Sequence, residues 1–301
     1  NRPQDFSAVF GSWIVEAAAK DLKICAITAA MKDGTGLEEF AAHYPERFYD
    51  VGIAESHAVT FSAGLAHGGF RPVFAVYSTF LQRAYDQVMQ DVAIANEHVV
   101  LAVDRAGVVG EDGETHQGVF DISFLSSIPG ITILSPATYP ELRACLDRAM
   151  YQCTGPVVVR YPKGREKAFP AGLHGNEKFQ LSEDKDILLV SYGRLSVHCC
   201  QAAELLRQKG IGAGVLKMTQ LLPYCEELLP VLLKKKDIFF VEEAVEQGSI
   251  AQMTGNLLLQ NGYQGNFFVR AVPNRFLAQA SVDEIFEELG WTPQMLAAWV
   301  E

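Results

Sequence analysis

Short apolar runs alternate with stretches of helical periodicity along the first half of this chain, and this alternation limits the folds open to it. The stretches 4–21, 57–68, 80–94 and 140–152 place apolar residues at helical spacing. Strands that are separated by helices pair in parallel, because each helix carries the chain back to the same edge of the sheet. We therefore predict a parallel α/β domain over residues 1–164, with strands at 24–29, 71–77, 99–104, 131–135 and 157–160.

A second alternation follows a polar stretch that contains Gly and Pro. Residues 165–182 show no sustained period and are predicted to be a linker. At 301 residues with 49% hydrophobic content, the chain can bury two cores. The predicted fold class is α/β, with two layered domains of which the second, 183–301, is smaller. Its predicted strands are 187–192, 213–218, 238–242 and 267–271, and its predicted helices are 196–209, 225–235 and 249–261.

The composition of the chain limits the partners that it can bind and the cellular compartment in which we expect it. A net charge of −11 argues against nucleic acid and against an anionic membrane surface. No apolar run approaches the ~20 residues needed to span a bilayer, and the N-terminus lacks a signal pattern. The six cysteines form no CxxC pair and no regular framework. We expect a soluble, reduced, cytoplasmic protein.

Glu55 is a single carboxylate inside a segment of small and apolar residues, 52–64, at a predicted strand-to-helix junction. Burial disfavours the charged form of a carboxylate, so Glu55 is a candidate protonatable group that donates a hydrogen bond. The alternative is a helix N-terminal carboxylate that interacts with the backbone donors and the helix dipole. The residues alone leave both interpretations open.

The glycine-rich segment 104–118 crowds several functional types into one turn after a strand. Its glycines let the backbone approach a ligand, while Arg105, Asp112 and His116 offer an anion clamp and acid/base groups. The alternative is a surface loop with solvated charges. Residues 107–110 resemble only part of a dinucleotide fingerprint, so a nicotinamide cofactor is weakly supported. Phe80, taken by itself, is predicted to be a core residue.

Several segments in order resemble a known family. They are 33–37, 50–55, 77–87, 104–107, 112–118 and 160–162. Together these segments resemble the 1-deoxy-D-xylulose-5-phosphate synthases, thiamine-diphosphate enzymes of the transketolase superfamily. The resemblance is strong over 33–164 and looser beyond. It implies a pyrimidine-binding domain followed by a transketolase C-terminal-like domain.

The resemblance implies a cofactor group and a catalytic group. The carboxylate matching Glu55 hydrogen-bonds the pyrimidine ring of thiamine diphosphate and promotes deprotonation of the reactive carbon. Phe80 stacks on the aminopyrimidine, and Ile53 lies beside the cofactor. Asp112 and His116 match polar groups near the substrate hydroxyl and aldehyde, where His116 moves a proton.

A substrate-binding group is implied in the same way. Tyr77, Arg83 and Arg105 match residues placed around glyceraldehyde 3-phosphate, since a guanidinium suits a phosphate. Lys163 stands where an Arg usually helps to hold the phosphate, so it keeps the charge and loses the paired donors. Two further departures are Ser56, where Gln is usual, and 278–280, where a His-Gly pair is typical.

The implied reaction decarboxylates pyruvate and joins the two-carbon unit to glyceraldehyde 3-phosphate. The product, 1-deoxy-D-xylulose 5-phosphate, is a precursor in isoprenoid, thiamine and pyridoxal biosynthesis. The Gly-Asp-Gly…Asn motif that holds Mg²⁺ and diphosphate in this superfamily is not found in the sequence. We expect the chain to be the C-terminal portion of a longer homodimeric synthase, inactive without its N-terminal diphosphate-binding domain, which would carry the Mg²⁺ ligands.

Two other functions stay open. One is a β-type subunit of a 2-oxoacid dehydrogenase or of a split transketolase, in which a separate chain brings the diphosphate domain. The other is a non-catalytic dimerisation or regulatory module. The second domain offers little chemistry: Glu242, Glu243 and the turn 247–249 are predicted to have a structural role.

Overall fold

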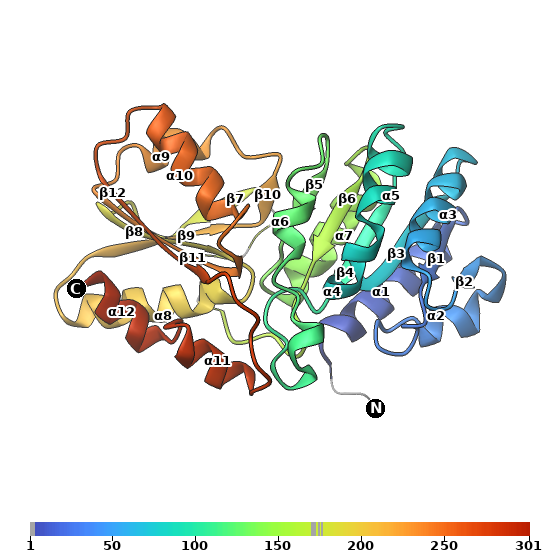
Figure 1. The fold of residues 1–301 in the computed structure, drawn as a ribbon, viewed down its shortest axis with the longest axis horizontal. Helices are drawn as coiled ribbons and strands as arrows, with labels where there is room; N and C mark the ends of the chain where they lie inside the picture. The colour runs from blue at the N-terminus through green and yellow to red at the C-terminus, as the bar shows by residue number, and fades with distance from the viewer. Residues whose placement is uncertain (1–3, 170–172, 174, 176) are drawn as a thin grey trace.

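Two mostly parallel sheets, each flanked by helices, lie side by side in the computed structural model (Figure 1). The structure describes residues 4–169, 173, 175 and 177–301. The sheets have seven and five strands among these residues. The predicted α/β class with two layered domains is therefore confirmed.

The first sheet has the order β10-β5-β6-β4-β3-β1-β2 and is parallel except for β10. Its central strand β4 is buried at every residue, because helices cover both faces. The strands are β1 (Ile24–Thr28), β2 (Phe48–Asp50), β3 (Arg71–Tyr77), β4 (Val100–Asp104), β5 (Thr132–Leu134), β6 (Val157–Arg160) and β10 (Gln220–Leu222). The α-helices of this half outside 78–93 are α1 (Phe6–Lys20), α2 (Glu38–His43), α3 (Glu55–His67), α6 (Asp121–Leu125) and α7 (Tyr139–Tyr151), and its short 3₁₀ turns include η1 (Pro45–Arg47), η4 (Gly110–Asp112) and η5 (Glu114–His116).

The second sheet has the order β12-β11-β8-β9-β7. Its strands are β7 (Phe179–Leu181), β8 (Ile187–Tyr192), β9 (Ala213–Met218), β11 (Asp237–Val245) and β12 (Asn266–Val272). The helices are α8 (Leu195–Gln208), α9 (Leu228–Leu232), α10 (Ile250–Gln260), α11 (Val282–Glu288) and α12 (Pro293–Val300).

Three short strands were not anticipated, one of which is β2 at the edge of the first sheet. The segment 165–182, predicted as a linker, contains β7, which pairs antiparallel with β9. β10 follows β9 in the chain and crosses to the first sheet, where it pairs antiparallel with β5. Each has three residues, too few for a period of two to be visible in the sequence. The limits of the two domains stay a prediction.

The segment 80–94, predicted as one helix, is a series of short helical pieces. They are α4 (Ser78–Leu81), η2 (Gln82–Ala84), α5 (Tyr85–Gln87) and the π-helical η3 (Val88–Ala93). The Ser56 hydroxyl donates to the Arg83 carbonyl at 2.7 Å, so this backbone group bonds outside its own helix. Such irregular turns often re-aim side chains at functional sites.

A shared apolar core joins the two domains. One hydrophobic cluster contains Val76 and Leu101 of the first sheet together with Val190 and Phe240 of the second. A second cluster lies under α1 and α7, and a third under α8, α11 and α12. Since the first cluster is continuous across the boundary, each domain contributes to the other's buried surface.

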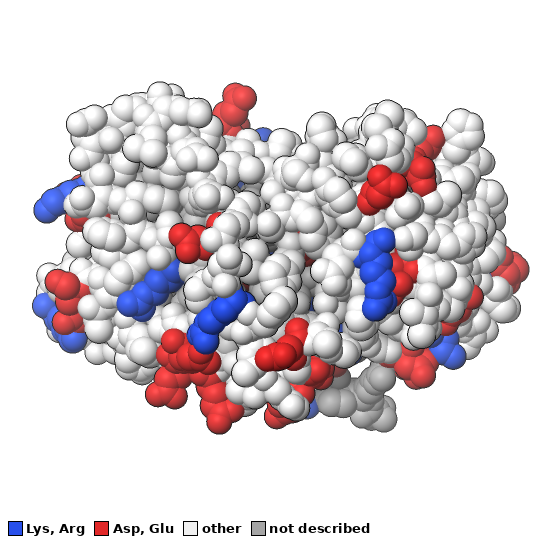
Figure 2. Space-filling view, in the orientation of Figure 1, with Lys and Arg blue, Asp and Glu red and all other residues white. Residues whose placement is uncertain are grey.

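The charge of the chain lies mainly at the surface. Figure 2 shows acidic side chains gathered along the lower margin of one face, with separate basic side chains between them and broad uncharged areas. No helix in the described part of the chain has the length and apolar character needed to cross a bilayer.

Candidate active site

The candidate site lies at the carboxyl ends of β3, β4 and β6, which are neighbours in the first sheet. The last residue of β3, Tyr77, is paired with the last residue of β4, Asp104. Arg105 follows β4, and Lys163 follows β6 by three residues. Parallel strands end at one edge of the sheet, so side chains distant in the sequence converge there.

Glu55 is the first residue of α3, and its side chain is only 4% exposed. Its Oε1 accepts a hydrogen bond from Nη1 of Arg83 at 2.8 Å, and Arg83 is half exposed. A guanidinium only donates, so Oε1 of Glu55 is an acceptor in this contact, and the donor role predicted for Glu55 stays a prediction. The burial predicted for Glu55 is present, while the ion pair was not anticipated.

Phe80 lies at the centre of an aromatic and cationic cluster. Its ring stacks on Tyr77 with centroids 5.9 Å apart and meets His116 edge-on at 5.3 Å. The Arg83 guanidinium carbon is 4.9 Å from the Phe80 ring centroid. Phe80 also packs against the core while staying partly exposed, so its predicted core contact is present, and its role in stacking on a cofactor stays a prediction.

Arg105 has a left-handed backbone, with φ of 59°, and a side chain that is 14% exposed. Its guanidinium carbon lies 3.7 Å from the Tyr77 ring centroid, and its Nη1 donates to the carbonyl of Gly34 at 3.0 Å. A Cβ on Gly34 would lie 1.6 Å from the Tyr77 hydroxyl, so any larger residue there would displace the Tyr77 side chain. The short segment around Gly34 therefore contacts both Tyr77 and Arg105.

Asp112 links two cations of the site. Its Oδ1 accepts from Lys163 Nζ at 2.5 Å, and its Oδ2 lies 3.9 Å from Arg105 Nε. Lys163 is 40% exposed and Arg105 is 14% exposed, so the solvent-facing cation of the two is mainly Lys163. This arrangement suits an anionic group such as a phosphate.

Asp104 is a site residue for which the sequence analysis proposed no role. It is fully buried, and its Oδ2 accepts from the Ser7 hydroxyl at 2.6 Å. Burial raises the pKa of Asp104 to about 6, although the adjacent Arg105 opposes the shift. The available signal was a carboxylate directly before Arg105 at the end of an apolar strand.

Two residues predicted for the site, Arg83 and Ile53, do not lie where the prediction placed them. Arg83 contacts Glu55 and Phe80, so the structure groups it with the proposed cofactor residues and not with the cations around Asp112. Ile53 lies in the loop before α3 and is 81% exposed. The remaining candidates come together through the contacts described above.

Arg160 and Lys163, three residues apart in the sequence, lie in two different surroundings. Lys163 belongs to the site, but Arg160 is buried at the domain boundary, where its Nε donates to Asp121 at 2.8 Å. Tyr192 of the second domain donates to Glu242 at 2.8 Å close by. Burial raises the pKa of Glu242.

In the described residues no group of three or more His, Cys, Asp or Glu side chains is arranged to hold a metal ion.

Comparison with known families identifies both halves of the chain. Residues 2–167 match the family described as transketolase, pyrimidine binding domain, and residues 178–296 match transketolase, C-terminal domain. The chain belongs to the transketolase family. A pyrimidine-binding domain of this family implies the use of thiamine diphosphate.

Within the transketolase family, the chain is similar to 1-deoxy-D-xylulose-5-phosphate synthases. It is 43% identical to that of Clostridium tetani over 95% of this chain and 47% of the relative. It is 44% identical to that of Caldanaerobacter subterraneus over 97% of this chain and 48% of the relative. The chain thus spans about half the length of the curated relatives it matches.

Solved structures show the same fold. A chain described as split gene transketolase, inactive beta4 tetramer, superposes with a TM-score of 0.82 at 24% identity and covers 98% of this chain and 96% of itself. The transketolase of Campylobacter jejuni also reaches 0.82, at 19% identity, with 98% of this chain and 46% of that chain covered. The two-domain arrangement is therefore that of the corresponding part of transketolases.

Proposed function

We propose that this chain is the pyrimidine-binding and C-terminal part of a thiamine-diphosphate-dependent 1-deoxy-D-xylulose-5-phosphate synthase. The assembled enzyme would decarboxylate pyruvate and join the two-carbon unit to D-glyceraldehyde 3-phosphate. The observation that carries the proposal is the convergence of Glu55, Phe80 and His116 with the Arg105–Asp112–Lys163 group at one sheet edge.

The residues around Glu55 fit the pyrimidine of the cofactor. A flat group with N–H donors, the Arg83 guanidinium, already lies against Phe80 and donates to Glu55. An aminopyrimidine offers the same combination of a flat face and N–H donors. When bound, thiamine diphosphate supplies the carbon nucleophile and electron sink for decarboxylation. Glu55 would exchange a proton with the ring, and Phe80 would orient it.

The second group fits the phosphorylated aldehyde. Lys163 and Arg105 would bind the phosphate, with Tyr77 supporting the Arg105 guanidinium from below. Asp112 would hold the two cations in place and bind a substrate hydroxyl. His116, partly exposed beside Phe80, would move a proton at the aldehyde oxygen.

Several parts of the machinery would come from outside this chain. We propose that the Mg²⁺ and diphosphate ligands come from a diphosphate-binding segment, on the same or another polypeptide. A homodimer, with the exposed Ile53 near the subunit contact, is proposed from the same resemblance. All six cysteines are free, which supports the proposed cytoplasmic location.

Reconstitution tests the proposal. The chain is combined with a diphosphate-binding segment that carries the Gly-Asp-Gly…Asn motif, thiamine diphosphate and Mg²⁺. Carbon dioxide release from pyruvate, stimulated by glyceraldehyde 3-phosphate, is expected. Glu55→Gln should lower kcat by ~10²–10⁴-fold. Glu97→Gln, whose carboxylate pairs with His67 outside the site, serves as the control. A reconstituted assembly that does not decarboxylate pyruvate would overturn the proposal.

A second candidate is a subunit of a split transketolase. The observation in its favour is the near-complete mutual coverage, 98% and 96%, with the split gene transketolase chain. Such an enzyme would transfer a two-carbon unit from a ketose without releasing carbon dioxide. The same reconstitution decides between the two, because only the synthase consumes pyruvate. A non-catalytic module would show neither activity.

A further inference from the structure

Residues 107–118, which carry Asp112 and His116, form a loop that is closed at its neck. The Gly107 amide donates to the Gly118 carbonyl at 2.7 Å, and the Gly118 amide donates back at 2.8 Å. Just inside this neck, the Val109 amide donates to the Gln117 side chain at 2.9 Å. These closing residues, 107–109 and 117–118, are the neck of the loop. The position of the loop therefore depends on the contacts that hold the neck.

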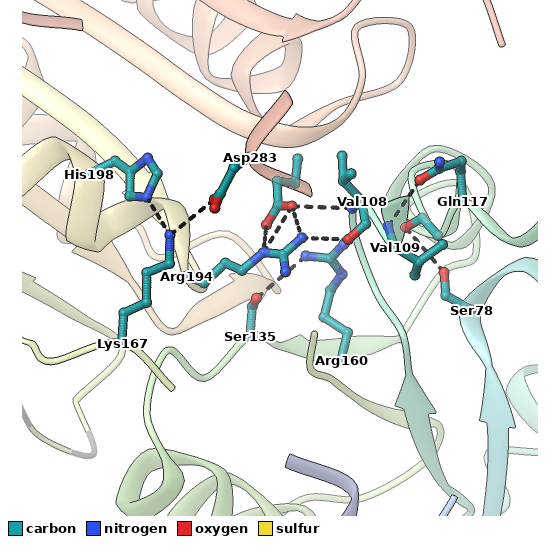
Figure 3. Close-up of polar contacts among 12 residues, drawn as sticks. Ser78, Val108, Val109, Gln117, Ser135, Arg160, Lys167, Arg194, His198 and Asp283 are labelled. Carbon is teal, nitrogen blue, oxygen red and sulfur yellow. Dashed lines mark hydrogen bonds and ion pairs between the residues drawn. The ribbon is translucent and has the colours of Figure 1, made fainter. Parts of the chain in front are cut away.

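The neck is held by the second domain, as Figure 3 shows. The Val108 amide donates to Oε1 of Glu243 at 3.1 Å, and the Val108 carbonyl accepts from Nη2 of Arg194. Arg194 and Glu243 form a paired ion contact with N–O distances of 2.6–3.1 Å. Glu243 is buried and Arg194 is mostly so, at 7% and 12% exposure of their side chains. Both backbone groups of Val108 thus find their partners in the other domain.

Packing reinforces these bonds. Val108 and Val119 are buried in the hydrophobic cluster under α8 and α11, which belongs to the second domain. At Gly107, where φ is +84°, an added Cβ would lie 2.9 Å from the Glu243 carboxylate. The Val245 amide donates to the Val119 carbonyl at 2.9 Å beyond the loop. The neck fits into the second domain with little free space.

The far part of the loop contacts both domains. The side-chain amide of Gln279, in the segment where a His-Gly pair is typical, donates through Nε2 to the Glu111 carbonyl at 2.9 Å. On the opposite side, the Thr79 hydroxyl donates to the Thr115 carbonyl at 2.9 Å, and His116 meets Phe80. The loop therefore bridges the proposed cofactor residues and the second domain.

We propose that Arg194 and Glu243 are positioning residues that set the place of loop 107–118, and through it the affinity of the site for its acceptor substrate. This inference rests on the proposed function for the acceptor, while the anchoring itself does not. Buried backbone groups need partners, so loss of the pair frees the neck. The second domain then has a role in the site, contrary to the purely structural role predicted from its sequence.

A matched pair of variants tests the anchoring in the chain alone. Glu243→Gln keeps the shape of the side chain and removes the charge that faces Arg194. Glu141→Gln is the control, because Glu141 is also buried, also pairs across the domain boundary with Lys217, and also accepts a backbone amide, that of Ala137. Amide exchange over residues 107–118 should become about tenfold faster in Glu243→Gln and stay unchanged in Glu141→Gln. Unchanged exchange in Glu243→Gln, or equal acceleration in both variants, overturns the proposal.

The reconstituted enzyme tests the effect on the acceptor. In Glu243→Gln the KM for glyceraldehyde 3-phosphate should rise about tenfold, while the KM for pyruvate changes less than about twofold. Arg194→Lys, which keeps the charge without the paired donors, should fall between wild type and Arg194→Ala. A parallel change in both KM values overturns the positioning role. If the wild-type assembly is inactive, the proposed function fails, and the exchange experiment still decides the anchoring.

Discussion

Removal of the Arg83 guanidinium tests how the buried Glu55 carboxylate is held. In Arg83→Ala the carboxylate, 4% exposed, loses the donor at 2.8 Å. Two unit charges at that distance attract by about 1.5 kcal/mol at the dielectric constant of water, and ordering the half-exposed Arg83 side chain removes part of this. Contact with Phe80 adds about 0.5–1 kcal/mol. We expect Arg83→Ala to lower the free energy of unfolding by about 1.5–2 kcal/mol.

A double-mutant cycle isolates the pair. Urea unfolding of Arg83→Ala, Glu55→Gln and the double variant should give a coupling free energy of about 1 kcal/mol. Arg143→Ala is the control, since the Arg143–Glu16 pair lies on the surface with both side chains more than a third exposed. Its cost should be at most about 0.5 kcal/mol. Equal losses in Arg83→Ala and Arg143→Ala, or a coupling below about 0.3 kcal/mol, would refute the reasoning.

Three further outcomes follow from the geometry. Because the folded pKa of Asp104 is about 6 against a usual 3.8, its contribution to stability is present below pH 3.8 and is lost as the pH rises through 6. The free energy of unfolding should fall by roughly 3 kcal/mol over this range. Urea unfolding at several pH values between 4 and 7 should show this fall in the wild type and not in Asp104→Asn. An equal fall in both proteins would contradict the prediction. Gly107→Ala should lower the free energy of unfolding by about 2–3 kcal/mol, because φ is +84° and the new Cβ meets Glu243. Gly52→Ala, with φ of +69° and open space, should cost only about 1–2 kcal/mol, and equal losses would exclude the steric contribution. Lys163→Arg in the reconstituted enzyme should lower the KM for the phosphorylated aldehyde about three- to tenfold, and an unchanged KM would count against a phosphate contact.

The regular parts of the fold were predictable because their signal is local. Strands β3, β6, β8 and β9 match their predicted limits, and β1 and β4 differ from theirs by one residue. Burial on both faces makes such strands continuous apolar runs that stand out in the sequence. The three-residue β10 carries no such signal, and its place in the first sheet depends on a crossover from the other domain.

The structure brings together most of the side chains that residue type and motif order had singled out, but their contacts were harder to predict. Glu55, Phe80, Arg105, Asp112 and His116 converge, and their roles stay predictions. Arg83 pairs with Glu55, which is 28 positions away in the sequence. Arg83 lies in a segment that was predicted as one helix and is a series of short helical pieces in the structure. No periodicity specifies the direction of a side chain at such a break.

By itself the sequence determined the α/β class, the family and the set of residues at the strand ends, because apolar period and residue chemistry are properties of the linear chain. Only the tertiary structure decided which side chains touch. Asp112 meets Lys163, 51 residues away, and Glu243 of the second domain meets Val108, 135 residues away. The physical reason is that ion pairs and backbone hydrogen bonds act over about 3 Å in space. Packing of the two domains brings these groups within that range, and it makes the second domain part of the site.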